Sequence, residues 1–292
     1  MSDIAHEIAS QPACWRTAVE RSGAYAELLP ADGERVAAVG CVTSLFVSQA
    51  YAALRESAGL GLTDAFAASE YPFGRRYDRV LAISRSGTTT EVVRLMESVP
   101  RGTPTLAICA VPGAPVVSSA TAAIVLDFAD ERSVVQTRFA TSALALLLAH
   151  TGRDLTTAIA HAEIAVSADL PVDPAGFDHW VFLGRGWTAG LANEAALKMR
   201  EVAGSWAESY PAMEYRHGPI SVAGARSVVW AIGDVEPDLL QDVAETGATV
   251  VARDHDPMAD LVSIQKTAVA LAEAKGLDPD HPRHLTRSVV LS

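Results

Sequence analysis

The stretch Arg35-Val-Ala-Ala-Val-Gly40 decides the fold, because a similar apolar run ending in glycine recurs at Asp178-His-Trp-Val-Phe-Leu-Gly184. Each run is followed by a turn and a helical pattern, which continues to about Glu56 in the first case and about Trp206 in the second. A strand, a glycine turn and a helix that occur twice in this order predict two α/β units related by duplication.

Further apolar runs extend both units. In the first unit, strands are expected at 79–83, 104–109 and 122–126, and helices at 89–98, 134–150 and 154–168. In the second, strands are expected at 179–183, 227–232 and 248–251, and helices at 189–203, 237–245 and 260–275. Short apolar runs without alternation, separated by helices, indicate parallel sheets that are covered on both faces.

Prolines and charged residues mark the boundaries. A cluster with Pro171, Pro174 and Gly176 divides the chain near residues 168–178. We expect an N-terminal helical segment at 1–30, a first domain at 31–168 and a second at 169–292. The tail 276–288 is too rich in proline to be helical throughout, and its ending Val289-Val290-Leu291 either adds a strand or lies across the domain.

Composition excludes several classes of function. The 292 residues carry a formal net charge of −12, which argues against nucleic-acid binding because that requires clustered Lys and Arg. The three cysteines make neither a disulfide framework nor a zinc pattern, and we expect no metal and no cofactor. Neither a signal peptide nor a membrane span is visible, so we expect a cytoplasmic protein.

The most specific motif is Ile83-Ser84-Arg85-Ser86-Gly87-Thr88-Thr89-Thr90-Glu91. It follows a predicted strand and opens a predicted helix, where backbone N–H groups and the helix dipole favour anions. Its hydroxyl groups add donors, so the motif predicts phosphate binding. The alternative is an ordinary helix cap, in which Thr88 and Glu91 form a capping box.

Three other places carry candidate side chains. Thr43 and Ser44 lie at another strand-to-helix turn and face the same crevice if the sheet is parallel. Lys198 and Glu201 share one face of a helix with Glu194, either as a solvated ion-pair surface or as a carboxylate base tuned by lysine. His217 precedes Gly-Pro and is either a surface histidine or a group that moves protons near neutral pH.

Together these motifs resemble the sugar isomerase (SIS) family in its double-domain form, especially the isomerase half of glucosamine-6-phosphate synthase and the amino-sugar-phosphate deaminases. Residues 84–91 resemble the family's Ser-x-Ser-Gly-x-Thr-x-Glu phosphate loop. Gly184-Arg-Gly186 with 194–201 resembles its second-domain signature, and Tyr215-Arg-His217-Gly-Pro resembles its Lys-His-Gly-Pro segment. The resemblance extends from about Arg35 to the C-terminus and implies two flavodoxin-like, doubly wound parallel-sheet domains.

The resemblance also implies roles. Glu201 would move a proton between C1 and C2 of an open-chain sugar, with Lys198 beside it. His217 would assist ring opening from the neighbouring subunit of a homodimer. The residues that would hold the phosphate of the sugar phosphate are Thr43, Ser44, Ser84, Arg85, Ser86 and Thr89.

Two departures from the family pattern narrow the function. The chain begins Met1-Ser2 and shows no glutaminase nucleophile, so we expect no glutamine-dependent synthesis. The remaining reactions use free ammonia, run in the deaminating direction or act on another 6-phosphosugar. Arg287 stands where synthase-like members carry a lysine, and a guanidinium cannot form a Schiff base, although it can contact an anion.

We therefore expect a phosphosugar aldose–ketose isomerase that deaminates an amino-sugar 6-phosphate of the glucosamine or galactosamine type, bound to neither nucleic acid nor membrane. The alternatives are a fructosamine-6-phosphate deglycase and a non-catalytic sugar-phosphate sensor.

Overall fold

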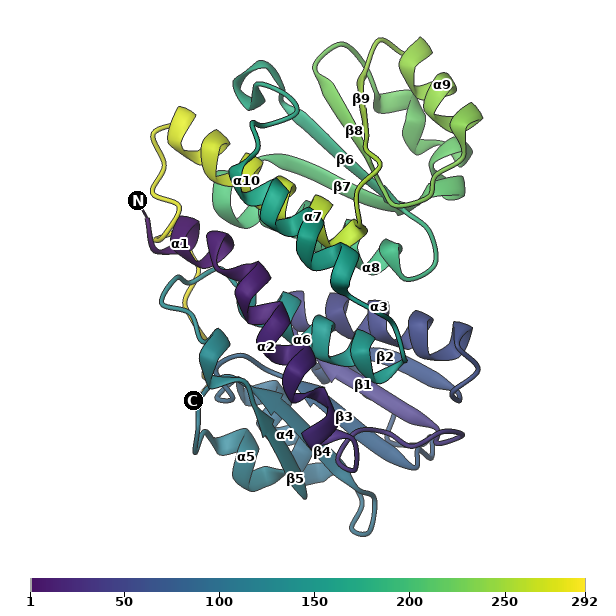
Figure 1. Cartoon of the computed structure of the whole chain (residues 1–292), viewed down its shortest axis with the longest axis vertical. Coiled ribbons are helices and arrows are strands. Elements are labelled where there is room, and N and C mark those ends of the chain that lie inside the picture. The colour runs from purple at the N-terminus through teal and green to yellow at the C-terminus, as the bar shows by residue number, and fades with distance from the viewer. Residues whose placement is uncertain (1, 292) are drawn as a thin grey trace. The chain divides into compact units, whose positions relative to one another are not determined.

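The computed structural model describes residues 2–291, which form two compact units (Figure 1). Residues 13–155 and 286–291 make the first-sheet unit. Residues 2–12 and 156–285 make the second-sheet unit. Each unit thus combines a long continuous stretch of chain with a short segment from one end of the chain. The expected domain limits at 31–168 and 169–292 stay predictions.

A five-stranded parallel sheet forms the centre of the first-sheet unit, in the order β2-β1-β3-β4-β5. This is the strand order of a flavodoxin-like doubly wound sheet. Its strands are β1 (Val36–Gly40), β2 (Thr63–Ala67), β3 (Arg79–Ile83), β4 (Thr105–Cys109) and β5 (Ala122–Val125).

Helices cover both faces of this sheet (Figure 1). α4 (Thr90–Ser98) and α5 (Pro115–Ser119) pack together on one face, where Val80, Ala107 and Leu95 are fully or nearly fully buried. α3 (Thr43–Ser57) packs against α6 (Arg138–His150). The N-terminal helix α2 spans Gln11–Ser22. Burial on both faces explains why these strands read as continuous apolar runs.

The second-sheet unit repeats the arrangement with one strand fewer, in the parallel order β7-β6-β8-β9. Its strands are β6 (His179–Gly184), β7 (Trp206–Pro211), β8 (Ser227–Ile232) and β9 (Thr249–Ala252). Its helices are α1 (Asp3–Ala9), α7 (Thr156–Ser167), α8 (Thr188–Ala203), α9 (Pro237–Glu245) and α10 (Pro257–Ala274). α10 packs against both α7 and α8.

The two-sheet α/β fold is as predicted, and the differences are local. β2 and β7 were not expected, because Thr63-Asp-Ala-Phe-Ala67 and Trp206-Ala-Glu-Ser-Tyr-Pro211 mix polar and apolar residues. Both are edge strands, which keep one side open to polar neighbours. The helix expected from Val134 begins only at Arg138, and Val289-Val290-Leu291 forms no strand.

Glycine at the end of a first strand is required in both units. A Cβ on Gly40 would lie 2.5 Å from Cβ of Ser44, and one on Gly184 would lie 2.2 Å from the backbone oxygen of Thr188. Real Cβ atoms essentially never approach so closely. Each glycine therefore lets the following helix start directly over the end of its strand.

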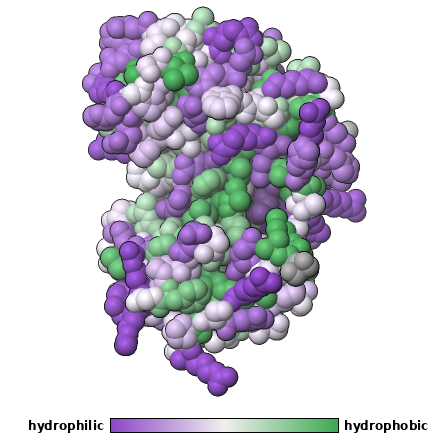
Figure 2. Space-filling view, turned by 180° about the vertical axis from the view of Figure 1, so that it is seen from behind, coloured by the Kyte–Doolittle hydropathy of each residue, from purple (hydrophilic) through white to green (hydrophobic). Residues whose placement is uncertain are grey.

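The face drawn in Figure 2 is mostly hydrophilic, with smaller apolar areas between the polar ones. Within residues 2–291, no helix is long and apolar enough to cross a bilayer.

Candidate functional site

A small polar pocket lies where β1 and β3 end in the first-sheet unit. Its volume is about 40 Å³. Among the residues that line it are four with hydroxyl groups: Ser44, Ser84, Ser86 and Thr89. Thr43 is the first residue of α3, just before Ser44, and is buried. The two turns that carry the predicted hydroxyl groups therefore meet at the carboxyl ends of parallel strands. Ser44 lines the pocket, whereas Thr43 does not.

Arg85 also lines this pocket, but its contacts hold it to the protein. Its guanidinium donates to the backbone oxygen of Ser133 at 3.0 Å and to that of Arg287 at 2.8 Å. The carboxylate of Glu131 lies 3.7 Å away, and both side chains are buried. Arg85 thus supplies fixed positive charge at the pocket, and direct contact with a phosphate stays a prediction.

Backbone conformation at the pocket is strained beside α3. Val42 has φ of +50°, although β-branched residues rarely adopt this region. Next to it, Cys41 lines the pocket, and burial raises the pKa of its thiol to about 11. Cys41 is therefore a neutral thiol at physiological pH rather than a nucleophile. Strain of this kind occurs at binding sites, where the surrounding structure fixes it.

Gln136 was missed by the sequence analysis. It lines the same pocket from the loop before α6, and its buried Oε1 has no hydrogen-bond partner among the described residues. A side-chain amide that is buried without a partner at a pocket wall is ready to meet a polar ligand. No local motif in the sequence marks this residue, because it enters the pocket from a separate loop.

The predicted capping box at Thr88 and Glu91 is wrong. α4 begins at Thr90, and its N-cap residue Thr89 makes no side-chain cap. Instead, the Thr88 hydroxyl donates to Oγ of Ser86 at 3.1 Å and to Oγ of Ser288 at 2.8 Å. The Thr88 hydroxyl therefore belongs to the polar loop rather than to the helix cap.

In the second-sheet unit, Lys198 is fully buried on α8 between two carboxylates. Its Nζ lies 2.5 Å from Oε2 of Glu201 and 3.3 Å from Oε1 of Glu194. Burial acts to lower the pKa of Lys198, but the attraction of both carboxylates outweighs it and the pKa is raised. The solvated ion-pair surface considered above is therefore wrong, and Lys198 is held as a cation that positions Glu201.

Glu201 is the more accessible of the two carboxylates and lines a pocket of about 340 Å³. Three basic side chains line the same pocket: Arg200, His281 and Arg283. His281 contacts Asp278 at 2.9 Å, and Arg200 donates to the backbone oxygen of Ala207 at 2.8 Å. A carboxylate that is held by lysine and opens on a polar pocket can accept a proton from a bound molecule.

His217 ends the short 3-10 helix Ala212–His217 and is exposed. Its neighbour Arg216 pairs with Asp238 and Asp242, both at 2.9 Å. Arg287, the predicted tail contact, lines the hydroxyl pocket and pairs with Asp130 at 2.5 Å. The role of His217 stays a prediction.

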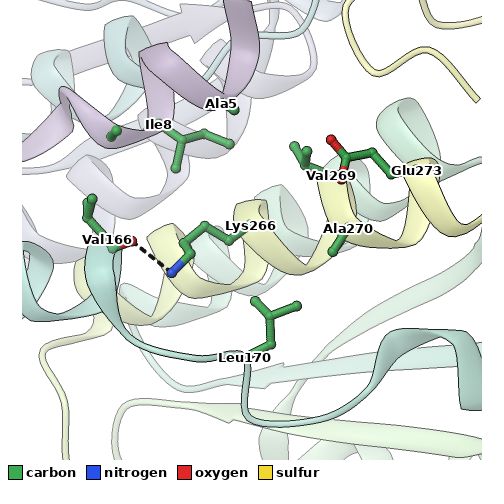
Figure 3. A pocket seen from close by; sticks show the side chains of 9 residues that line it. Ala5, Ile8, Val166, Leu170, Lys266, Val269, Ala270 and Glu273 are labelled. Carbon is green, nitrogen blue, oxygen red and sulfur yellow. Dashed lines mark hydrogen bonds between the residues drawn. The ribbon is translucent and has the colours of Figure 1, made fainter. Parts of the chain in front are cut away.

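A larger pocket of about 430 Å³ lies among α1, α7 and α10 (Figure 3). Its walls are mainly apolar, and Lys266 lies at its base. The ammonium of Lys266 donates to the backbone oxygens of Ala165, Val166 and Ala168 at 2.8, 2.9 and 2.6 Å, and so caps the end of α7. This cation is used structurally, so this apolar pocket is not where we place chemistry.

Within residues 2–291, no three His, Cys, Asp or Glu side chains are grouped to hold a metal ion. The arrangement of described residues instead offers hydroxyl groups for an anion in one unit and a lysine-held carboxylate in the other.

Comparisons with known proteins found similar sequences and similar folds. No protein-family model matches the chain. A glutamine–fructose-6-phosphate aminotransferase of Sulfurisphaera tokodaii is 27% identical over 89% of this chain and 50% of its own length. The chain thus spans about half the length of the curated relatives it matches.

Two solved structures share the fold over nearly the whole chain. Glucosamine-6-phosphate deaminase of Thermotoga maritima has a TM-score of 0.81 at 24% identity, covering 99% of this chain and 100% of that one. Tagatose-6-phosphate ketose/aldose isomerase of Escherichia coli has a TM-score of 0.79 at 20% identity, covering 100% and 96%.

Proposed function

This chain belongs to the double-SIS family of phosphosugar isomerases, and on that premise we propose that it converts an amino-sugar 6-phosphate into a ketose 6-phosphate and ammonia. The observation that carries the proposal is the pocket of hydroxyl groups at the ends of β1 and β3. The relatives named above are described as acting on phosphorylated sugars or amino sugars, which supports this substrate class.

The phosphate is the group by which the protein binds the substrate. Ser84, Ser86 and Thr89 offer hydroxyl donors at the start of α4, where the helix dipole favours an anion. Arg85 adds positive charge that the protein fixes in place. Binding energy gained on the phosphate, far from the reacting carbons, orients them for proton transfer.

The chemical step requires one base and no redox change. Glu201 removes the proton from C2 of the open-chain 2-amino-aldose phosphate. The electrons of that C–H bond form the C1–C2 double bond while O1 takes a proton from water, which gives an enaminol. Return of the first proton to C1 and loss of a proton from nitrogen to water give a C2 imine, and addition of water there expels ammonia and leaves the ketose. Lys198 keeps the carboxylate of Glu201 in place through their 2.5 Å contact.

His217 is proposed to open the sugar ring by moving a proton, in a homodimer where it acts from the neighbouring subunit. Its exposure in the single chain supports this role, since a contact across an interface requires a surface residue. The homodimer is part of the proposal.

The test is to incubate the protein with glucosamine, galactosamine and unmodified hexose 6-phosphates and to measure ammonia and ketose phosphate together. Glu201→Gln should lower kcat by about 10²- to 10⁴-fold and leave fructose 6-phosphate binding intact. Glu245→Gln, on the exposed side of α9, is the matched control and should behave as the unaltered protein. Turnover that survives in Glu201→Gln would remove Glu201 from the reaction, and binding without any turnover would leave a sugar-phosphate sensor.

A second reaction is favoured by one observation, the basic side chains beside Glu201. Arg200 and Arg283 could hold the carboxylate of an amino acid joined to the sugar, as in a fructosamine 6-phosphate. Glu201 would then remove a proton from C1, and water would release the amino acid and an aldose phosphate. Release of a free amino acid instead of ammonia in the same assay identifies this reaction.

A further inference from the structure

Another pocket of the first-sheet unit lies at the amino ends of its strands. Its volume is about 600 Å³, which is within the range of pockets that bind small molecules. Arg35 precedes β1, Asp78 precedes β3 and Thr103 comes shortly before β4, and all three line the pocket. Because the strands are parallel, this pocket lies at the opposite edge of the sheet from the hydroxyl groups of Ser84 and Ser86.

The pocket carries one positive charge that no carboxylate balances. Three arginines line it, and we call it the arginine pocket after them: Arg35, Arg75 and Arg76. The guanidinium of Arg35 donates to both carboxylate oxygens of Asp78, at 3.2 and 3.0 Å, and that of Arg75 lies 3.5 Å from the carboxylate of Asp64. The side chain of Arg76 is exposed and makes no hydrogen bond or ion pair within residues 2–291. Its guanidinium is therefore available to an anion.

Three aromatic side chains form another part of the wall. Tyr71 and Tyr77 are buried in the core of the first-sheet unit, with ring centres 6.1 Å apart. Phe73 packs on Tyr71, with ring centres 5.0 Å apart and ring planes at 77°, and yet it is 55% exposed. An apolar ring that is held by buried neighbours and left open to water offers a surface on which a flat ring can stack.

The backbone holds this exposed ring in place. The N–H of Phe73 donates to the backbone oxygen of Tyr71 at 3.1 Å, and the N–H of Arg75 donates to that of Pro72 at 2.9 Å. The loop then ends at the buried Tyr77. The aromatic ring is therefore in position before a ligand arrives, which lowers the entropy cost of binding.

We propose that the arginine pocket binds a nucleotide, whose base stacks on Phe73 and whose phosphate meets Arg76. A guanidinium matches the geometry of phosphate oxygens, and an aromatic side chain accepts any base on its face. A nucleoside would use the ring of Phe73 alone, so the nucleotide should bind more tightly. This site goes beyond the proposed function and does not rest on it, because none of its residues lines the hydroxyl pocket or the pocket of Glu201.

The test measures the Kd of AMP and of UMP for the full chain by calorimetry. Adenosine, which lacks the phosphate, should bind at least about tenfold more weakly than AMP. Arg76→Gln should raise both Kd values about tenfold, as expected for a lost hydrogen bond to a charged group, and Phe73→Leu should act in the same direction by removing the stacking surface. Arg101→Gln is the matched control, because Arg101 is an exposed arginine of the same unit that does not line the pocket.

A second pair of measurements separates the arginine pocket from the hydroxyl pocket, which also offers donors to a phosphate. Ser84→Ala should bind AMP as tightly as the unaltered protein, and Arg76→Gln should bind fructose 6-phosphate as tightly as the unaltered protein. If neither nucleotide binds, or if Arg76→Gln binds both without loss, the arginine pocket is not a nucleotide site. If Ser84→Ala weakens AMP binding and Arg76→Gln does not, the nucleotide occupies the hydroxyl pocket and the inference is wrong.

Discussion

The loop after β3 and the loop after β8 occupy the same place in the two sheets but carry opposite chemistry. Each follows the strand next to the first strand of its unit. The first, residues 84–89, is rich in hydroxyl groups and contains Arg85. The second, Gly233-Asp-Val-Glu236, presents two carboxylates. One scaffold therefore presents hydroxyl donors in one copy and carboxylates in the other, where Glu236 pairs with Arg185 at 2.8 Å. The difference lies in the composition of the loops and not in the fold.

The helices that follow the first strands, α3 and α8, differ in the side chain that they bury at one corresponding position. Lys198 lies 14 residues after Gly184, and Leu54 lies 14 residues after Gly40. Both positions are buried, but one holds a cation between carboxylates and the other an aliphatic side chain. At these corresponding positions α8 therefore holds a buried charge and α3 an aliphatic side chain, and α3 buries its own charged side chain one residue later, at Arg55.

The largest expected effect comes from exchanging that buried charge. Lys198→Met leaves Glu194 and Glu201 without their shared cation and should lower the free energy of unfolding by about 3–5 kcal/mol. Leu54→Met, at the corresponding place, should lower it by less than about 1.5 kcal/mol. Urea unfolding at pH 7 measures both. Equal losses would mean that the ion triad contributes no more than ordinary packing.

The strand-end glycines should show the two copies behaving alike. Gly40→Ala and Gly184→Ala each force a methyl group into backbone atoms and should cost about 1–3 kcal/mol, with the larger loss at Gly184. Gly176→Ala is the control, because nothing lies within 4 Å of its Cβ position. Thermal unfolding compares the three. Tolerance of either substitution would show that the helix can shift away from the strand.

The two loops can be compared by ligand binding. Ser84→Ala removes one pocket hydroxyl and should raise the Kd for fructose 6-phosphate about tenfold, as expected for a hydrogen bond to a charged group. Asp234→Ala, in the acidic loop, should leave that Kd unchanged. Ser84 suits the test because the tail hydroxyl lies on Ser86 and Thr88 instead. An equal effect of both variants would remove the assigned difference between the loops.

The smallest expected effect is a pH dependence in the second-sheet unit. Burial raises the pKa of Asp260, on α10, to about 7, against the opposing attraction of Arg253. A carboxyl whose pKa is higher in the folded state stabilises the fold at low pH, and that contribution is lost as the pH rises from about 4 to 7. Asp260→Asn should therefore flatten this part of the stability curve and be the more stable form at pH 8, by about 1–2 kcal/mol. Thermal melts over this pH range measure the stability of both forms. If stability changes with pH in the variant as it does in the unaltered protein, Asp260 is not the group responsible.

The central strands and their glycine turns could be predicted because their signals are local. Val36–Gly40 and His179–Gly184 are continuous apolar runs, as strands buried on both faces must be. The edge strand Thr63–Ala67 is not a continuous apolar run, because it pairs with another strand on one side only. Local pattern thus identifies the middle of a sheet better than its border.

The candidate site shows the same contrast between residues with a local signal and residues without one. The hydroxyl groups of 84–89 follow one another in sequence and could be found as a motif, whereas Gln136 reaches the pocket from a distant loop. The burial of Lys198 could not be read from its spacing, because the same spacing occurs on exposed helix faces. Its burial depends on how α10 packs against α8, which is a property of the folded unit.

The tail ties the end of the chain to a loop that comes 202 residues earlier. Ser288 meets the hydroxyl groups of Ser86 and Thr88, and Arg287 pairs with Asp130. Contacts between residues so far apart in sequence carry the entropy cost of closing a long loop. The final arrangement of residues 84–89 therefore depends on the whole length of the chain and not on the motif alone.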